Sequence, residues 1–346
     1  MKNKRIIFEI THPKHFHQFK NLVKALEEDN EILIVARNKD VVLSLLKNVD
    51  TECFVYNDFG KNIFAKILLI PKLLLKYNRI IRKFKPDIII SRSSAYSVFV
   101  SRFHKCKTVI FPDSEVVTLT KKFVAPWSDL IITPQNYTID YGKKHHRVSG
   151  FFEGSYLSPK YFSPDIKIIK SNIQETDEKF FFLRFVGWQA NHDVNQFGFD
   201  IEQKRVLVNL LSAHGKVLIS SEKTIEKEFE HLNIHIPPQN IHHILSRASM
   251  YIGDSQSMAT EAALLGVPSV RYNSFVGEKD MSNFIKLEKE LGLLYNFNDF
   301  DLLLIKIKEL LKNETLKDEW QERRAGYFEN TGDINRESLD IISVFI

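Results

Sequence analysis

The sequence predicts an α/β protein with two doubly wound domains. Short runs rich in Ile, Val and Phe alternate with helical stretches along most of the chain, and these runs are apolar throughout. Such runs are typical of parallel strands that helices cover on both faces. The alternation breaks once, after Gly150, in a stretch with two prolines and several charges. Because single cores stop growing near about 250–300 residues, a length of 346 residues fits two domains better than one.

The first domain is expected over residues 1–157. Its first strand is followed by an amphipathic helix, residues 15–28, in which five apolar residues recur on one face. Further helices are expected at 41–47 and 96–103, with a long helical region between them. The predicted strands of this domain are residues 6–10, 31–36, 53–56, 87–91, 108–111 and 130–133.

The second domain is expected over residues 158–330, beginning with a loop at 158–178. A C-terminal segment, 331–346, is set apart from it. Ligands of doubly wound sheets bind at the carboxyl ends of the strands, so two such domains suit a ligand with two unlike halves. The predicted strands are residues 180–185, 217–220, 233–236, 250–253 and 269–271. The predicted helices are residues 202–211, 260–265, 301–312, 316–327 and 336–345.

The composition excludes several classes of protein. The formal net charge of +5 is too small to indicate a nucleic-acid partner. No run approaches the roughly 20 apolar residues of a membrane span, and the N-terminus reaches Glu9 too soon for a signal peptide. We therefore expect a cytoplasmic protein. Cys53 and Cys106 stand in apolar stretches without metal-binding spacing, which indicates reduced thiols.

The stretch 251–271 predicts an anion site. A strand ends at Gly253, and small polar residues then turn the chain into a helix. The N–H groups and the positive dipole end at a helix start favour a phosphate group. The hydroxyls of Ser255 and Ser257 add donors, with Gln256 between them.

Two charged residues accompany this predicted anion site. Glu261 lies about one turn into the helix, where its carboxylate could accept hydrogen bonds from a ribose diol. Arg271, at the end of the next strand, could reach a diphosphate bidentately. The alternative is a capped helix with a glutamate matched to its dipole. We favour the ligand site because the turn, the glutamate and the arginine would all lie at the same end of the sheet.

Three histidines, His12, His15 and His17, follow the first strand. No carboxylate or thiol is spaced to complete a metal site with them, so no metal is expected. His12 in the loop, or His15 at the helix start, is the better candidate for a proton transfer or a phosphate contact. The alternative is that these are loop and capping histidines.

The stretch 251–271 resembles the nucleotide-binding element shared by glycosyltransferase-B enzymes and UDP-N-acetylglucosamine 2-epimerases. In those proteins a strand, a Ser/Gly turn and a helix bearing glutamate precede Leu-Gly-x-Pro, which matches residues 265–268 here. The chain departs from the epimerases at Gln256 and Ser257, where they have glycines that let the backbone approach the diphosphate closely.

Along nearly its whole length, the sequence is similar to the domain of unknown function 354 family, which is related to the same enzymes. This resemblance implies the glycosyltransferase-B architecture, two Rossmann-like domains facing a cleft, with residues 331–346 crossing back to the first domain. It also implies a UDP-sugar as substrate, without a further cofactor, but it implies no particular reaction. The matching stretches are residues 11–17, 111–115, 184–193, 219–222 and 253–277.

Two acids, Asp113 and Glu115, follow the predicted strand 108–111. Acids at the carboxyl end of a strand suit a general base that deprotonates a sugar hydroxyl. The resemblance adds that related epimerases have a catalytic glutamate near this place. The alternative is an N-cap and an acid matched to the dipole of the following helix.

The stretch 184–193 begins at the end of the first strand of the second domain. The resembled epimerases have an arginine-rich, histidine-bearing loop at this point, with different spacing. Because the match is positional, the resemblance carries over only the site. Within it, Arg184 is our candidate nucleotide contact and His192 our candidate catalytic group. The alternative is a structural tryptophan, Trp188, with a capping aspartate, Asp193.

Three functions remain open at this stage. A glycosyltransferase would move a sugar from UDP to a glycan or lipid-linked acceptor in surface polysaccharide synthesis, with Glu115 or Asp113 as the base. A 2-epimerase would need acids and bases on both faces of one sugar ring, and its sequence markers are incomplete here. A non-catalytic glycan- or nucleotide-binding protein is disfavoured by the many polar residues at strand ends. We favour the transferase.

The segment 61–85 carries eight basic residues and no acid, and its apolar residues recur at helical spacing. A basic amphipathic helix can lie on an anionic membrane surface, here at the inner face. Pro71 is expected to kink this helix or to start a second one. The alternative is a helix that covers the core and turns a solvated basic face outward.

We predict weak, salt-sensitive binding of this segment to anionic vesicles, because each Lys or Arg near such a surface contributes about 1 kcal/mol, which salt screens. Replacing Lys72, Lys76, Arg79 and Arg82 with glutamine should abolish co-sedimentation and leave nucleotide binding intact. A parent protein that ignores anionic vesicles at low salt would show that the segment is only a solvated helix.

Overall fold

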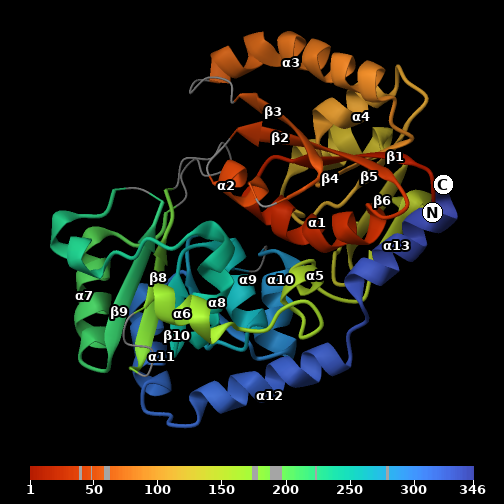
Figure 1. Cartoon of the computed structure of the whole chain (residues 1–346). Coiled ribbons are helices and arrows are strands. Elements are labelled where there is room, and N and C mark those ends of the chain that lie inside the picture. Colours follow the sequence, from red (N-terminus) through yellow and green to blue (C-terminus); the bar gives the residue numbers. More distant parts are fainter. Residues whose placement is uncertain are drawn as a thin grey trace. The chain divides into compact units, whose positions relative to one another are not determined.

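The chain folds into two compact α/β units, which confirms the expected fold class (Figure 1). Unit 1 combines Met1–Tyr156 with Gly332–Ile346, and unit 2 is Leu157–Thr331. The computed structural model describes residues 1–38, 41–47, 49–57, 63–173, 178–187, 197–222, 224–277 and 280–346, with the backbone alone at 63–68.

A seven-stranded parallel sheet forms the centre of unit 1, in the order β3-β2-β1-β4-β5-β6-β7. Its edge strand β7 is not among the predicted strands, because its sequence His-His-Arg-Val contains no apolar run. The strands are β1 (Arg5–Ile10), β2 (Glu31–Asn38), β3 (Glu52–Asn57), β4 (Ile88–Ser91), β5 (Lys107–Ile110), β6 (Leu130–Pro134) and β7 (His145–Val148).

Helices cover both faces of this sheet, as the apolar strands predict (Figure 1). Alternate residues of β1 show the division: Phe8 packs on the α1 side, where its ring centre lies 5.7 Å from that of Phe19, and Ile7 packs on the α3 side. One face carries α1 (Pro13–Leu26), α2 (Val42–Leu46) and α13 (Ile334–Phe345). The other carries α3 (Ile63–Phe84), α4 (Ala95–Ser101) and the π-helical turn η1 (Thr120–Val124).

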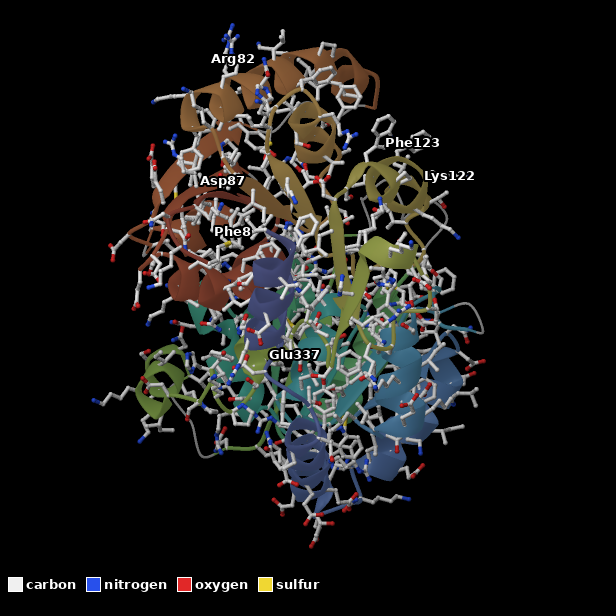
Figure 2. All side chains as sticks on the ribbon, turned by 90° about the vertical axis from the view of Figure 1, so that its right-hand side faces the viewer. Phe8, Arg82, Asp87, Lys122, Phe123 and Glu337 are labelled. Atoms are coloured by element: carbon white, nitrogen blue, oxygen red, sulfur yellow. The ribbon has the colours of Figure 1, made fainter. Side chains whose placement is uncertain are left out.

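The segment around Pro71 forms a single helix, α3, and no second helix begins at the proline. The side of α3 that packs on the sheet includes Leu73, Tyr77 and Ile81. Its basic residues Lys72, Arg79, Arg82 and Lys83 are exposed, and Arg82 points outward in Figure 2.

The C-terminal helix α13 belongs to unit 1. Ile334 and Ile342 enter the core on the α1 side of the sheet. Glu337, labelled in Figure 2, accepts hydrogen bonds from the backbone N of Ser149 at 2.7 Å and from its Oγ at 2.6 Å. Asn335 Nδ2 donates to the carbonyl of Ser155 at 2.8 Å.

Unit 2 is built on a five-stranded parallel sheet in the order β12-β11-β10-β8-β9. The strands are β8 (Phe180–Phe185), β9 (Lys216–Ser221), β10 (Met250–Gly253), β11 (Ser269–Tyr272) and β12 (Leu294–Phe297). The helices are α6 (Ile166–Asn172), α7 (Ile201–Ser212), α8 (Ile241–Arg247), α9 (Gln256–Leu264), α10 (Ser282–Ile285), α11 (Phe300–Leu310) and α12 (Leu316–Glu329), and α5 (Gly154–Leu157) lies at the division between the units.

Two expectations for this unit are wrong. The predicted strand 233–236 forms only one isolated bridge, between Asn233 and Ile219, because a 3₁₀ helix precedes it and Pro237 and Pro238 follow it. The predicted loop 158–178 contains α6, whose N-cap Asp165 accepts a hydrogen bond from Lys167 N at 2.8 Å.

Candidate functional site

In unit 2, the predicted anion site lies where β10 leads into α9. Ser255 is the N-cap of α9, and its Oγ accepts a hydrogen bond from Met258 N at 3.4 Å. Gln256 and Ser257 begin the first turn, and all these side chains are partly exposed. The first N–H groups of a helix have no partner within it, so this turn presents donors and the positive end of a nine-residue helix.

The end of β10 approaches β8 closely. A Cβ atom on Gly253 would lie 2.7 Å from the carbonyl oxygen of Arg184, so only glycine fits there. The next residue, Asp254, is 3% exposed, and its Oδ1 accepts a hydrogen bond from Val186 N at 2.8 Å. Asp254 thereby fixes Val186, the residue that follows β8, beside the start of α9. In the sequence, the only indication of a role for Asp254 was its position between Gly253 and the N-cap Ser255.

Glu261 lies inside unit 2. The residue is 7% exposed, and its Oε1 is 3.2 Å from Nε2 of His242 in α8. A ribose diol at this carboxylate would compete with His242. The sequence gives no sign of this contact, because it depends on how α8 packs beside α9.

Arg271 is fully buried. Its guanidinium forms an ion pair with Asp280, donates from Nε to Asn296 Oδ1 at 2.8 Å and lies 3.5 Å from the ring centre of Phe284. Burial lowers the pKa of Arg271 to about 10, against the opposing effect of Asp280, so the group stays charged at neutral pH. Arg271 therefore links β11 to β12 and α10. A diphosphate could bind Arg271 only by displacing Asp280 from its ion pair.

Arg184, at the end of β8, is held by residues at the end of β9. Its Nη1 donates to Ser220 Oγ at 2.7 Å and its Nη2 donates to Glu222 Oε1 at 2.8 Å. The other oxygen of Glu222 accepts a hydrogen bond from Gly187 N at 3.2 Å. The stretch 219–222 thus fixes the position of Arg184, on the strand that pairs with the end of β10.

His192, the last predicted residue of this unit, lies outside the described residues, as do Trp188 and Asp193. Within the described ranges of the chain, no three His, Cys, Asp or Glu side chains are placed to hold a metal ion.

In unit 1, four charged side chains meet at the carboxyl ends of the strands. They come from the first turn of α1, from the loops after β4 and β5, and from the start of α5: Lys14, Arg92, Asp113 and Glu153. Lys14 Nζ lies 3.0 Å from Asp113 Oδ2 and 2.9 Å from Glu153 Oε1. Arg92 forms an ion pair with Asp113. Two cations therefore balance two carboxylates, and only Asp113 was predicted from the sequence.

Arg92 is the most enclosed cation of this cluster, at 5% exposure. It donates a hydrogen bond to Gln18 Oε1, and its guanidinium carbon lies 5.2 Å from the ring centre of Phe152. Its Nε has no hydrogen-bond partner among the described residues. The one sequence signal for Arg92 was its place directly after an apolar strand.

The cluster favours the ionised forms of Asp113 and Lys14. Burial alone would raise the pKa of Asp113, but the charges of Arg92 and Lys14 outweigh it and hold this pKa well below its usual range. Burial likewise opposes the charge of Lys14, yet Glu153 and Asp113 raise its pKa. Asp113 is therefore an anion held by two cations, which makes it a weak proton acceptor.

The two predicted histidines lie beside this cluster. His12 is the N-cap of α1, and its Nδ1 accepts a hydrogen bond from Lys14 N at 3.2 Å. His15 Nδ1 lies 3.2 Å from Thr11 Oγ1. Burial, together with the charges of Arg92 and His12, lowers the pKa of His15 well below its usual value, so this imidazole is neutral at pH 7.

Glu115 points to a different partner. Its Oε1 accepts hydrogen bonds from Thr138 N at 2.7 Å and Thr138 Oγ1 at 3.0 Å, in the loop after β6. The two predicted acids therefore differ in environment: Asp113 belongs to the ion-pair cluster, and Glu115 accepts hydrogen bonds from the uncharged donors of Thr138.

The pKa of Asp113 predicts an acid-sensitive contribution to stability. Because the folded pKa lies below the ordinary value, the unfolded chain binds a proton at a higher pH than the folded one. The contribution is therefore present above about pH 4–5 and is lost as the pH falls below this range. We expect Asp113→Asn to lower the free energy of unfolding by about 1–3 kcal/mol at pH 7 and to flatten its decline between pH 5 and pH 3.

Denaturant titrations across this pH range measure the effect. Asp340→Asn is the matched control, because Asp340 is exposed and 3.9 Å from Arg336 on the same helix. Equal pH profiles for Asp113→Asn and the parent protein would contradict the prediction.

Solved structures with the same fold cover the whole chain. The chain aligns with S. aureus MnaA in a co-structure with UDP at a TM-score of 0.69 and 14% identity, covering 97% of this chain and 94% of that one. For the UDP-GlcNAc 2-epimerase of Neisseria meningitidis bound to UDP-GlcNAc, the TM-score is 0.67 at 11% identity, with 98% and 99% covered. For the glycosyltransferase of kitacinnamycin it is 0.66 at 10% identity, with 100% of each chain covered.

These identities show a shared fold and no more. No curated protein sequence matches the chain. The family model described as "Protein of unknown function (DUF354)" matches residues 4–323, nearly the whole chain. This match agrees with the stretches that carried the resemblance in the sequence, and the chain therefore belongs to the DUF354 family.

Proposed function

We propose that the protein is a nucleotide-sugar-dependent enzyme of surface glycan synthesis, and specifically a glycosyltransferase that uses a UDP-sugar. The observation that carries this proposal is the start of α9, where the N-cap Ser255, Gln256 and Ser257 present helix N–H groups beside a strand end that only glycine fits. This arrangement suits a diphosphate. Structures of the same fold with UDP and UDP-GlcNAc support the choice of nucleotide.

Within this proposal the groups have distinct roles. Unit 2 binds the diphosphate at the start of α9, with Glu261 toward the ribose and Arg184 at the adjoining strand end. In unit 1, Glu115 is the general base toward an acceptor hydroxyl, because Asp113 is held by Lys14 and Arg92. His12 and Asp113 are then positioning groups near the acceptor.

The second candidate is a sugar-nucleotide 2-epimerase. Several structures with the same fold are epimerases, and the acids and histidines of unit 1 are groups that such chemistry uses. We rank it below the transferase because Gln256 and Ser257 stand where the epimerases have glycines. A non-catalytic nucleotide-binding protein is the third candidate.

The nucleotide site predicts stabilisation by ligand. UDP at one hundred times its dissociation constant should stabilise the protein by about 2.7 kcal/mol, seen as a higher melting temperature. Ser257→Asp should lower the affinity for UDP at least tenfold through repulsion of the diphosphate. The same change should not reduce stability, because an acid in the first turn of a helix is favourable.

A thermal-shift screen across nucleoside diphosphates and nucleotide sugars tests this prediction and names the base. Ser343→Asp, at an exposed position on α13, is the control for a change of net charge. The proposal fails if no nucleotide stabilises the parent protein, or if Ser257→Asp responds as the parent does.

Incubation with labelled UDP-sugars separates the three candidates. A transferase releases UDP and labels a glycan or lipid-linked acceptor, an epimerase returns an epimerised nucleotide sugar, and a binding protein does neither. We expect transfer.

If Glu115 is the general base, Glu115→Gln should reduce turnover by about 10²-fold or more and leave the thermal shift with UDP unchanged. The control is Glu329→Gln, at an exposed position of α12, which should not change turnover. Unchanged turnover in Glu115→Gln would show that Glu115 is not the general base.

A further inference from the structure

Unit 1 exposes a set of large apolar side chains on the α4 and η1 side of its sheet. They come from α4 and the turn after it, and from the crossover that connects β5 to β6. Each is between 51% and 73% exposed: Phe99, Phe103, Val116, Leu119, Phe123 and Trp127, here called the aromatic patch. Monomeric proteins seldom expose so many large apolar groups in two adjoining elements without a partner for them.

The structure holds this patch outward. Within the crossover, Val124 and Ala125 face the core, where they pack with Val98, Ile110 and Ile131, while the neighbouring Phe123 faces solvent. Figure 2 shows Phe123 and Lys122 at the outer side of their turn.

Within the α4 half of the patch, the rings of Phe99 and Phe103 lie 5.8 Å apart. One contact joins this half to the crossover: the guanidinium carbon of Arg102 lies 5.7 Å from the ring centre of Trp127. Lys144 Nζ fastens the Trp127 loop by donating to the carbonyls of Ala125 at 2.7 Å and of Pro126 and Ser128 at 2.9 Å.

The exposed charges within the patch segments are basic. Arg102, Lys105, Lys121 and Lys122 are exposed, and the stretches 95–107 and 116–127 contain no acid. The acids that flank the second stretch, Glu115 and Asp129, are half-buried and accept hydrogen bonds from Thr138 and Thr108. The patch also adjoins α3: α4 packs beside α3, and the His104 ring nitrogen Nε2 lies 2.6 Å from Asn78 Oδ1. The exposed cations of α3 therefore lie on the helix that packs next to α4.

We propose that the aromatic patch inserts into the headgroup region of an anionic lipid bilayer. Aromatic side chains with an apolar body, ringed by cations, match the interface of such a bilayer, where burial of apolar groups and attraction to anionic lipids act together. A second copy docking through the same patch would set cations against cations. In the described part of the chain, no helix is long and apolar enough to cross a membrane, so the contact is made at the bilayer surface.

This inference goes beyond the proposed function and does not rest on it. It also changes the expectation for α3, which now supplies the long-range attraction while the patch supplies the insertion. Neutralising four cations of α3 should therefore weaken vesicle binding and increase its dependence on the patch, without abolishing it.

Co-sedimentation with vesicles of phosphatidylcholine and phosphatidylglycerol at 3:1, compared with phosphatidylcholine alone, tests the proposal. Leu119→Ser with Phe123→Ser should lower binding to the anionic vesicles at least tenfold. Lys121→Gln with Lys122→Gln should lower it at low salt and have less effect at high salt. Leu302→Ser with Ile305→Ser, at exposed positions of α11 in unit 2, is the matched control and should bind as the parent does.

Tryptophan fluorescence reports insertion directly. Anionic vesicles should shift the emission to shorter wavelength, and Trp127→Phe should remove this shift while sedimentation persists. Trp320 is buried and should not respond. Trp188 is present in both the parent and Trp127→Phe, so the difference between their spectra reports Trp127. The melting temperatures of the patch variants, measured with and without UDP, should equal those of the parent. Equal values would show that the variants are folded and that the loss of vesicle binding has another cause.

Three results would overturn the proposal. The first is a parent protein that does not bind anionic vesicles at low salt, and the second is a Leu119/Phe123 variant that binds them as well as the parent. The third is a concentration-dependent dimer in light scattering that this variant abolishes, which would make the patch an interface between two copies.

Discussion

The parallel sheets of both units depend on strands that are apolar on both faces, and this constraint decides where the chemistry can lie. A buried strand such as β4 is apolar at Ile88, Ile89 and Ile90 and has a polar side chain only at its last residue, Ser91. Most polar groups therefore lie at the end of a strand or in the segment that follows it, and parallel strands bring these positions to one edge. Arg92 after β4 and Asp113 after β5 meet for this reason.

Charges at such an edge are partly buried, and burial is tolerable only when each has a partner. The arginines that end or follow strands meet this condition in the same way: Arg92 pairs with Asp113, Arg184 with Glu222 and Arg271 with Asp280. The pairs differ in depth. Arg271 is enclosed and fixes its surroundings, whereas Arg184 and Asp113 remain partly open and can contact a ligand.

The sequence was sufficient for features that depend on local pattern, and insufficient for those that depend on sheet order. Apolar runs identified most of the described strands but missed two edge strands, β7 and β12. They also wrongly predicted a strand at 233–236, before two prolines. The N-cap Ser255 was found because capping is local. The partners of Asp113 were not, because Lys14 and Arg92 reach it only when β1, β4 and β5 stand in one sheet. Equally, nothing local shows that Glu115 turns to Thr138 or that Glu261 faces His242.

One crossover of unit 1 carries two kinds of group. Asp113 and Glu115 stand at its start, and Val116 of the aromatic patch is the next residue along the chain. If the patch rests on a bilayer, the acids lie within a few residues of the lipid headgroups, about 3.3–3.6 Å of chain per residue. An acceptor that is linked to lipid would then reach the acids from the bilayer itself. A water-borne acceptor would gain nothing from such a contact. Membrane contact through the aromatic patch would therefore favour a lipid-linked acceptor, and the two can be tested separately.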